Sequence, residues 1–359
     1  MKFVHIADMH FDTPFITLSS KTDLCKLRRI EQKETLKRII QFIKENEIPY
    51  LFISGDLYEH KYIRESTIEF VNNLFKTIPA TKIFISPGNH DPYLKKSFYN
   101  NFDWNENVHI FHSRLEKIEL DKLNIYGYGF DDFYLGRVNL EDIKLDDKDK
   151  LNILIMHGTL DGSETTENTY NPISKKVLEQ IGFDYVALGH IHKTNYDANC
   201  NQKIIYPGST ISLGFDELGE HGMIVGEIEK DKLSLEFVKM DPKVFVEKEI
   251  DISEINSDEE LIEKINKLEI EENTFCKIIL VGTRNFEINI NEINKLNNNK
   301  NILKIKNKTK IEYDIENISK ETTLKGMFAK EILEEIKNDP LKKEFFDDVF
   351  EIGLEILDK

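Results

Sequence analysis

The sequence predicts a layered α/β domain, followed by a small α+β unit and two C-terminal helices. Over the first 190 residues, short β-rich runs alternate with longer helical patterns, as in layered α/β domains. From residue 204 to residue 240, strands joined by Gly-containing turns replace that alternation. Because 359 residues exceed what one hydrophobic core usually supports, a second domain is expected after the first.

The strands of the first domain are expected at residues 3–7, 50–54, 82–86, 151–156 and 184–188. Between them, apolar residues at helical spacing predict helices at residues 24–46 and 67–78. Residues 204–206, 223–228 and 233–240 are expected to form an antiparallel sheet that closes the domain. Most of this pattern is explained by core packing.

The second part of the chain starts after Asp241 and Pro242. A strand at 244–250, a helix at 258–268 and a strand at 275–281 predict an α+β unit. The expected domains are therefore residues 1–243, 244–318 and 319–359. The last segment forms two amphipathic helices separated by Pro340. Their apolar faces either pack within the chain, which is the favoured interpretation, or bind a partner helix.

Composition and charge narrow the function classes. Hydrophobic residues make up 40% and charged residues 31% of the chain, which is typical of soluble globular proteins. No apolar run could span a bilayer and no secretory signal is recognisable, so a cytoplasmic protein without membrane contact is expected. Three widely spaced cysteines predict neither a disulfide framework nor a thiolate zinc site. The net charge of −17 argues against nucleic acid as a substrate unless positive charge is local.

Five polar motifs stand at the ends of the five predicted strands. Because the carboxyl ends of strands converge on the ligand crevice of an open α/β sheet, these motifs should meet in space. On an extended chain, Asp8 and His10 would point the same way and reach one ion, as would His190 and His192. The motifs are Asp8-Met9-His10, Gly55-Asp56, Gly88-Asn89-His90-Asp91, Met156-His157-Gly158 and Gly189-His190-Ile191-His192.

These motifs predict a centre with two divalent metal ions. Carboxylate, imidazole and amide donors without thiolate favour Mn²⁺, with iron and zinc as alternatives. Asp56 would bridge the ions, a water that they activate would attack phosphorus, and His90 would protonate the leaving oxygen. An isolated histidine is more often a core or surface residue, but five motifs in this order favour metal binding. The expected ligands are Asp8, His10, Asp56, Asn89, His157, His190 and His192.

The ordered motifs resemble the calcineurin-like metallophosphoesterase superfamily over about residues 1–215, including Tyr206-Pro207-Gly208-Ser209. The resemblance implies a metallophosphoesterase sandwich with His90 as the catalytic histidine. It also implies two ligand sets that share Asp56. One ion would be held by Asp8, His10, Asp56 and His192, and the other by Asp56, Asn89, His157 and His190.

Within that superfamily, the chain is similar to the DNA-repair exonuclease branch of SbcD-like and YhaO-like nuclease subunits. The similarity rests on chain length, the run Gly55-Asp56-Leu57-Tyr58, the Tyr-Pro-Gly-Ser segment and the α+β extension. It implies DNA ends as substrate, a capping domain, a homodimer and a coiled-coil SMC-like ATPase partner, for which the C-terminal helices are the candidate site. One departure is Glu59, at the place of a second catalytic histidine in several of these nucleases, with His60 one position later.

Two basic segments could contact DNA phosphates. Lys304, Lys306, Lys308 and Lys310 alternate along an expected strand, which would put them on one face. The alternative is an edge strand that lysines protect from aggregation. Residues 21–38 hold seven basic and three acidic residues, among them Arg28 and Arg29. A solvated helix face is the alternative there.

The leading hypothesis is an Mn²⁺-dependent DNA exonuclease or endonuclease in DNA end processing or repair. The first alternative is a phosphodiesterase or phosphatase for a small substrate. A protein phosphatase is disfavoured because the Asp-Arg-Gly run of that family is absent after Asp56. The second alternative is a non-catalytic scaffold for an ATPase partner, which the full set of expected ligands disfavours.

Overall fold

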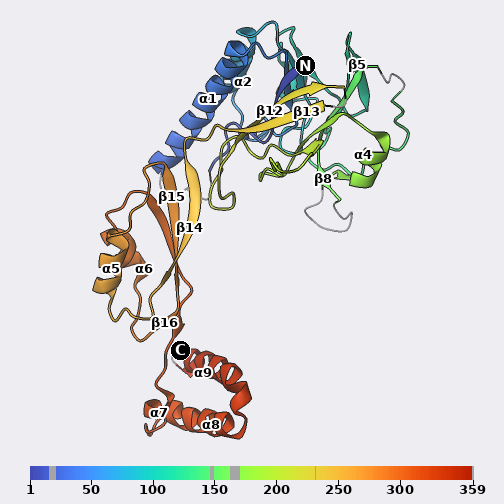
Figure 1. Cartoon of the computed structure of the whole chain (residues 1–359). Helices are drawn as coiled ribbons and strands as arrows, with labels where there is room; N and C mark the ends of the chain where they lie inside the picture. The colour runs from blue at the N-terminus through green and yellow to red at the C-terminus, as the bar shows by residue number, and fades with distance from the viewer. Residues whose placement is uncertain (16–21, 146–148, 162–169, 231, 358–359) are drawn as a thin grey trace. The chain divides into compact units, whose positions relative to one another are not determined.

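The computed structural model describes residues 1–15, 22–145, 149–161, 170–230 and 232–357. Contacts between residues divide the chain into two compact units, residues 1–245 and 246–359 (Figure 1). The predicted separation of residues 244–318 from residues 319–359 stays a prediction, because the second unit contains nearly all of the first segment and the whole of the second.

The first unit contains a six-stranded sheet with the order β13-β12-β1-β2-β3-β4. The four strands β1 to β4 run parallel, whereas β12 is antiparallel to both β1 and β13. This sheet contains three of the expected parallel strands and the expected antiparallel hairpin. Its strands are β1 (Lys2–Ile6), β2 (Tyr50–Ile53), β3 (Lys82–Ile85), β4 (Val108–Ile110), β12 (Gly222–Glu229) and β13 (Lys232–Lys239).

A second, five-stranded sheet has the order β11-β10-β7-β6-β5. The segment at 204–206 was expected in the antiparallel sheet, but β11 pairs parallel with β10 instead. The five motif-bearing strands are thus shared between two sheets and do not form one open sheet. The strands are β5 (Glu116–Glu119), β6 (Leu123–Tyr128), β7 (Leu151–His157), β10 (Tyr185–Gly189) and β11 (Ile204–Ile205), and a small separate pair is β8 (Thr159–Leu160) with β9 (Pro172–Ile173).

The two sheets face each other, with helices on their outer faces. Phe52 packs between the sheets against residues such as Ile153, while its neighbours Leu51 and Ile53 pack towards the helices, since alternate strand residues face opposite sides. Leu178 covers the outer face of the second sheet. The layered α/β prediction is therefore confirmed. The helices are α1 (Thr22–Glu45), α2 (Glu65–Lys76), α3 (Phe98–Asn101) and α4 (Lys175–Ile181).

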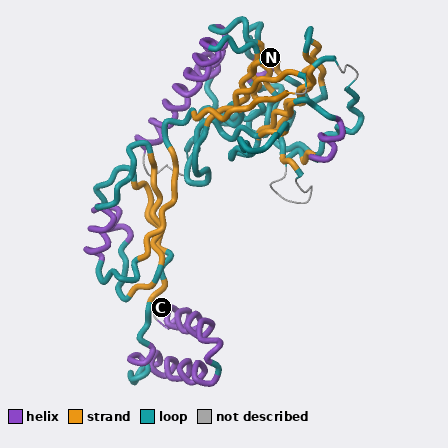
Figure 2. Tube along the Cα trace, in the orientation of Figure 1, coloured by secondary structure: helices purple, strands orange, loops and turns teal. Residues whose placement is uncertain are grey.

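The second unit contains a three-stranded sheet with the order β14-β15-β17, and Figure 2 shows two helices on one side of it. Leu261 and Ile293 from these helices pack on Ile278 and Leu280 of the central strand. The expected strand–helix–strand order is confirmed. The elements are β14 (Val244–Asp251), α5 (Asp258–Asn266), β15 (Thr274–Val281), α6 (Ile290–Leu296) and β17 (Ile302–Asn307), with the pair β16 (Thr283–Arg284) and β18 (Lys310–Ile311).

The C-terminal segment contains the two expected helices, which lie side by side in Figure 1. Ala329 and Ile332 of one helix pack against Phe350 and Leu354 of the other. Other apolar residues are exposed, including Leu341 at 98%. The helices therefore pack within the chain in part and leave apolar surface free in part. The elements are α7 (Ile315–Ile318), α8 (Leu324–Asn338), the 3₁₀ turn η2 (Pro340–Lys342) and α9 (Lys343–Leu357).

None of the helices in the described ranges has both the length and the apolar character needed to cross a membrane.

Candidate metal centre

The polar motifs meet where β1, β2 and β3 of one sheet and β7 and β10 of the other end. A continuous chain of close contacts joins all seven expected ligands. It runs from Asp8 through His192, His10, Asp56, His157 and Asn89 to His190. Asp8, His10, Asp56, Asn89 and His157 are buried. Residues up to 184 positions apart in sequence thus form one polar cluster in an otherwise apolar interior.

The backbone after β1 is not extended, so the simple alternation expected for Asp8 and His10 is wrong. Their φ angles are 51° and 48°, and those of Asp56 and His190 are 52° and 103°. Non-glycine residues rarely adopt such angles, and they do so mainly where surrounding structure enforces them. Here Asp8 N donates to Gly55 O at 3.1 Å and His10 N donates to Asp56 O at 2.9 Å. These bonds between loops turn the side chains towards the centre.

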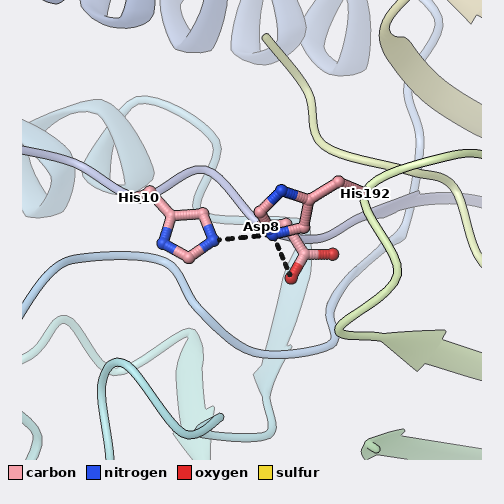
Figure 3. A group of neighbouring side chains, drawn as sticks. All are labelled: Asp8, His10 and His192. Atoms are coloured by element: carbon pink, nitrogen blue, oxygen red, sulfur yellow. Dashed lines mark hydrogen bonds and ion pairs between the residues drawn. The ribbon is translucent and has the colours of Figure 1, made fainter. Parts of the chain in front are cut away.

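Asp8, His10 and His192 form the first half of the centre (Figure 3). His10 Nε2 lies 3.1 Å from His192 Nε2, which lies 3.9 Å from Asp8 Oδ1. Carboxylates face the opposite nitrogen of each ring: Glu59 Oε1 lies 2.8 Å from His10 Nδ1, and Glu217 Oε1 lies 2.6 Å from His192 Nδ1. With the proton on Nδ1, each Nε2 presents a lone pair, so these atoms repel unless a proton or a cation lies between them.

Asp56 connects this half to a second one. Its Oδ2 lies 3.8 Å from His10 Nε2 and 3.3 Å from His157 Nε2. Asn89 Oδ1 lies 2.9 Å from His157 Nε2 and 3.2 Å from His190 Nδ1. Asp56 therefore occupies the position that a bridging carboxylate requires, with imidazoles on both sides.

The loops that carry these residues are held together by Asp91 and by one glycine. Asp91 Oδ1 accepts hydrogen bonds from Asp56 N at 3.0 Å and Gly88 N at 2.7 Å, which joins the loop after β2 to the loop after β3. Gly55 has a φ of 92°, and a Cβ there would overlap the ring of His157. Glycine is required at this position both for its backbone conformation and for the close approach of the histidine.

His90 lies at the exposed side of the centre, paired with Glu59. Its side chain is 45% exposed, and its Nδ1 lies 3.0 Å from Glu59 Oε2. Burial alone would lower the pKa of His90, but the hydrogen bond with Glu59 and the charge of Asp56 raise that pKa to about 9. Burial would raise the pKa of Glu59, whereas its hydrogen bonds with His10 and His90 lower it to about 2. The pair is therefore ionised at neutral pH.

The structure distinguishes the two residues at the departure from the related nucleases. Glu59 uses one oxygen for His10 and the other for His90. The ring of His60 lies against Phe133, with centroids 5.6 Å apart, and its buried Nδ1 has no hydrogen-bond partner among the described residues. Glu59, and not His60, is thus the residue that contacts the centre.

Sequence reasoning gave no role to Glu217, which joins His192 to Ser209 through two carboxylate contacts of 2.6 and 2.7 Å. No local motif marks this glutamate, because it follows His192 by 25 residues in an irregular segment. The Tyr-Pro-Gly-Ser segment is recognisable in the sequence, and the serine of that segment is the second partner of Glu217.

Arg28 was expected to contact nucleic acid, and this expectation is wrong. Its side chain is fully buried and forms a double hydrogen bond with the buried Asp241, at 3.0 and 2.8 Å. It also donates to Ser212 O at 2.7 Å. Arg28 therefore joins α1 to the end of the first unit and has no surface to offer DNA. Arg29 is half-buried and remains a candidate for DNA contact.

The four lysines of the expected stripe are not buried, but they do not share one strand. Lys304 and Lys306 lie in β17, which ends at Asn307, whereas Lys310 lies in β18 and pairs in a different sheet. Lys310 is also paired with Asp348 at 2.9 Å. Because β17 is an edge strand, protection against aggregation remains as good an explanation for its lysines as DNA contact.

The donors fit divalent metal ions. Three groups bring ligand atoms within 4.8 Å of one another: Asp8, His10 and His192; His10, Asp56 and His90; and Asp8, Asp56 and His157. The donors are carboxylate and imidazole, as borderline divalent ions prefer. The convergence of two imidazole lone pairs and two buried carboxylates has no structural use without a cation.

Comparison with known proteins agrees with this geometry. Residues 1–194 match the family described as calcineurin-like phosphoesterase. The chain is 26% identical over 292 residues to the uncharacterized metallophosphoesterase YhaO of Bacillus subtilis, covering 79% of this chain and 69% of YhaO. It is 29% identical over 279 residues to the D subunit of the nuclease SbcCD of Staphylococcus epidermidis, covering 67% of this chain and 70% of that protein.

Among solved structures, the crystal structure of TT1561 from Thermus thermophilus is 12% identical and covers 66% of this chain and 98% of its own, with a TM-score of 0.38. So weak a likeness adds nothing to the family assignment. The family match extends over more than half of the chain and includes all the motif residues of the centre. The chain therefore belongs to the calcineurin-like phosphoesterase family, whose members bind divalent metals, and to its SbcD-like and YhaO-like branch.

Proposed function

We propose that this chain is an Mn²⁺-dependent DNA nuclease that hydrolyses phosphodiester bonds during DNA end processing or repair. The observation that carries the proposal is the position of Asp56 between two sets of imidazole ligands, 3.8 Å from His10 and 3.3 Å from His157. The similarity to a protein named as part of a nuclease supports DNA as the substrate.

Asp8, His10, Asp56 and His192 would hold one ion, and Asp56, Asn89, His157 and His190 the other. Two ions bound in this way activate a water for attack on phosphorus and clamp the phosphoryl oxygens. Each residue has a defined task in this proposal. Because Glu59 faces Nδ1 of His90, the protonated ring presents Nε2–H on its exposed side. When the phosphorus–oxygen ester bond breaks, His90 gives that proton to the leaving oxygen.

The test is manganese-dependent release of nucleotides from end-labelled single-stranded and double-stranded DNA by the purified full-length chain. An Asp56→Ala variant is the control for a contaminating nuclease. We expect release with the wild-type chain and none with the variant. Mutant-insensitive release, or no hydrolysis of any phosphodiester, would contradict the proposal.

The acidic character of the chain favours one alternative, a small phosphorylated substrate. A net charge of −17 repels a polyanion, and Lys310 is already paired with Asp348. Hydrolysis of a small artificial phosphodiester that depends on Asp56, without any release of nucleotides from DNA, would favour this alternative and keep the metal centre.

We further propose that the C-terminal helices bind a coiled-coil ATPase of the SMC-like type. Leu324 and Met327 of α8 are 72% and 63% exposed, Leu341 is 98% exposed, and Phe345 of α9 is 60% exposed. Apolar residues of this kind anchor helices in partner grooves. One relative is named as one component of a complex, which supports the presence of a partner.

Deletion of residues 319–359 should abolish ATPase binding and spare metal binding. The double variant Leu341→Glu with Phe345→Glu is the milder test, because both side chains are exposed and neither belongs to the small helical core. Unchanged affinity for the ATPase in both variants would contradict this proposal. A homodimer and a cytoplasmic location complete the proposed picture, and sedimentation of the purified chain tests the first of them.

A further inference from the structure

The histidines of the first half are held from behind by carboxylates. Glu59 Oε1 faces His10 Nδ1 at 2.8 Å, and Glu217 Oε1 faces His192 Nδ1 at 2.6 Å. Both glutamates are largely buried, with side chains 15% and 10% exposed. Each imidazole is thus fixed in the tautomer that leaves Nε2 as the acceptor, and a negative charge increases the basicity of that atom.

The histidines of the second half lack this arrangement. His157 Nδ1 faces the neutral backbone carbonyl of Ser54 at 2.9 Å. His190 Nδ1 lies 3.2 Å from Asn89 Oδ1, which is an amide oxygen. Apart from the shared Asp56, the second half therefore consists of neutral donors, whereas the first half has Asp8 in contact with the centre and two carboxylates behind its rings.

We propose that the chain binds its two metal ions with unequal affinity, and that Glu59 and Glu217 are the positioning residues that set the difference. The ion at Asp8, His10 and His192 is held tightly, and the ion at Asn89, His157 and His190 exchanges readily. Loss of such an outer partner typically weakens metal binding about 10- to 100-fold. This inference rests on the proposed two-metal centre and adds an order of occupation to it.

Glu217 also has structural contacts, so its test must separate the two roles. Its Oε2 accepts from the Ser209 hydroxyl at 2.7 Å and from Leu213 N at 3.2 Å. Glu217→Gln keeps the size of the side chain and one oxygen acceptor but removes the charge. Glu220→Gln is the matched control, because Glu220 lies three positions away, is 59% exposed and pairs with Lys239 outside the centre.

The experiment is calorimetric titration of Mn²⁺ into the metal-free full-length chain. We expect a tight and a weak class of sites in the wild type and in Glu220→Gln. In Glu217→Gln the tight class should weaken about 10- to 100-fold while the weak class stays unchanged. Glu59→Gln should weaken the same class through His10, which keeps the inference testable if Glu217→Gln does not fold. A purely structural role would weaken both classes together.

Two further variants assign the classes. Asn89→Ala should remove the weak class alone, and His192→Ala should remove the tight class. Two equal classes in the wild type, or weakening of the other class by Glu217→Gln and Glu59→Gln, would overturn the inference and leave the two-metal centre intact. Failure of the wild type to bind Mn²⁺, or binding that Asp56→Ala does not change, would instead overturn the proposed centre.

Discussion

Replacing Arg28 by alanine should strongly destabilise the first unit of the chain. The guanidinium and the carboxylate of Asp241 are both fully buried and joined by two hydrogen bonds of 3.0 and 2.8 Å. Without Arg28, Asp241 becomes a buried charge without a cationic partner, for which about 3–5 kcal/mol is typical. Backbone amides of Ser212 and Lys243 still donate to Asp241, at 2.8 and 2.9 Å, which places the expected loss near the lower limit of that range.

The assay is urea unfolding followed by fluorescence of Trp104. This is the single tryptophan of the chain and packs on the core beneath α2, so its signal reports on the first unit. Extrapolation to water then gives the change in the free energy of unfolding. Arg29→Ala is the matched control, since Arg29 is half-buried and its hydrogen bond to Thr13 O is 3.3 Å long. We expect a change within about 0.5 kcal/mol for this neighbour.

Combining Arg28→Ala with Asp241→Asn should recover part of the lost stability, because the double variant leaves no buried charge unpaired. A loss below about 1 kcal/mol for Arg28→Ala would refute the reasoning, since an exposed pair contributes no more than that. Weaker DNA binding at unchanged stability would restore the original expectation that Arg28 contacts nucleic acid.

Four further predictions concern the centre and the lysines. His90→Ala should keep both metal-binding classes in calorimetry but lower kcat about 10²- to 10⁴-fold, and unchanged turnover would show that His90 is not the acid. In the metal-free chain, NMR titration should give His90 a pKa of about 9, and Glu59→Gln should move that pKa towards 6.5; since the folded pKa is raised, the stabilisation by this pair is complete below about pH 6.5 and is lost as pH rises through about 9. Mn²⁺ at about 100 times its Kd should raise the free energy of unfolding by about 2.7 kcal/mol, and a chelator should reverse the gain; no shift would mean that the folded chain holds no metal. Lys304→Ala with Lys306→Ala should reduce the slope of log affinity for DNA against log salt by up to about 2, and an unchanged slope would favour the edge-strand explanation.

The positions of the motif-bearing strands could be predicted from sequence because each is a short, largely buried apolar run. The strand Tyr50–Ile53 is an example, with three of four residues buried. The strands β4, β5 and β6 were missed. Glu116–Glu119 alternates half-buried and exposed residues, and Val108–Ile110 has only three residues, so neither has a pattern distinct from a loop. Their pairing partners, and not their own sequence, make them strands.

The residues expected to bind metal were identified because Asp, His and Asn recur at strand ends in one order, and the structure brings all seven together. Local sequence could not reveal the left-handed backbone of Asp8 and His10, since neither is glycine. Long-range hydrogen bonds to the loop after β2 impose that conformation. The assignment of these residues as ligands is the part that metal titration must now test.

The sequence by itself determined the layered fold, the order of the ligand motifs and the amphipathic C-terminal helices, because each of these depends on residue type and local spacing. Only the tertiary structure decided what Arg28, Glu59 and Glu217 do. A charged side chain looks the same in sequence whether water or another charge surrounds it. For these three residues the partner lies on a different loop or element, and burial converts an ordinary surface charge into a buried ion pair or the support of a histidine.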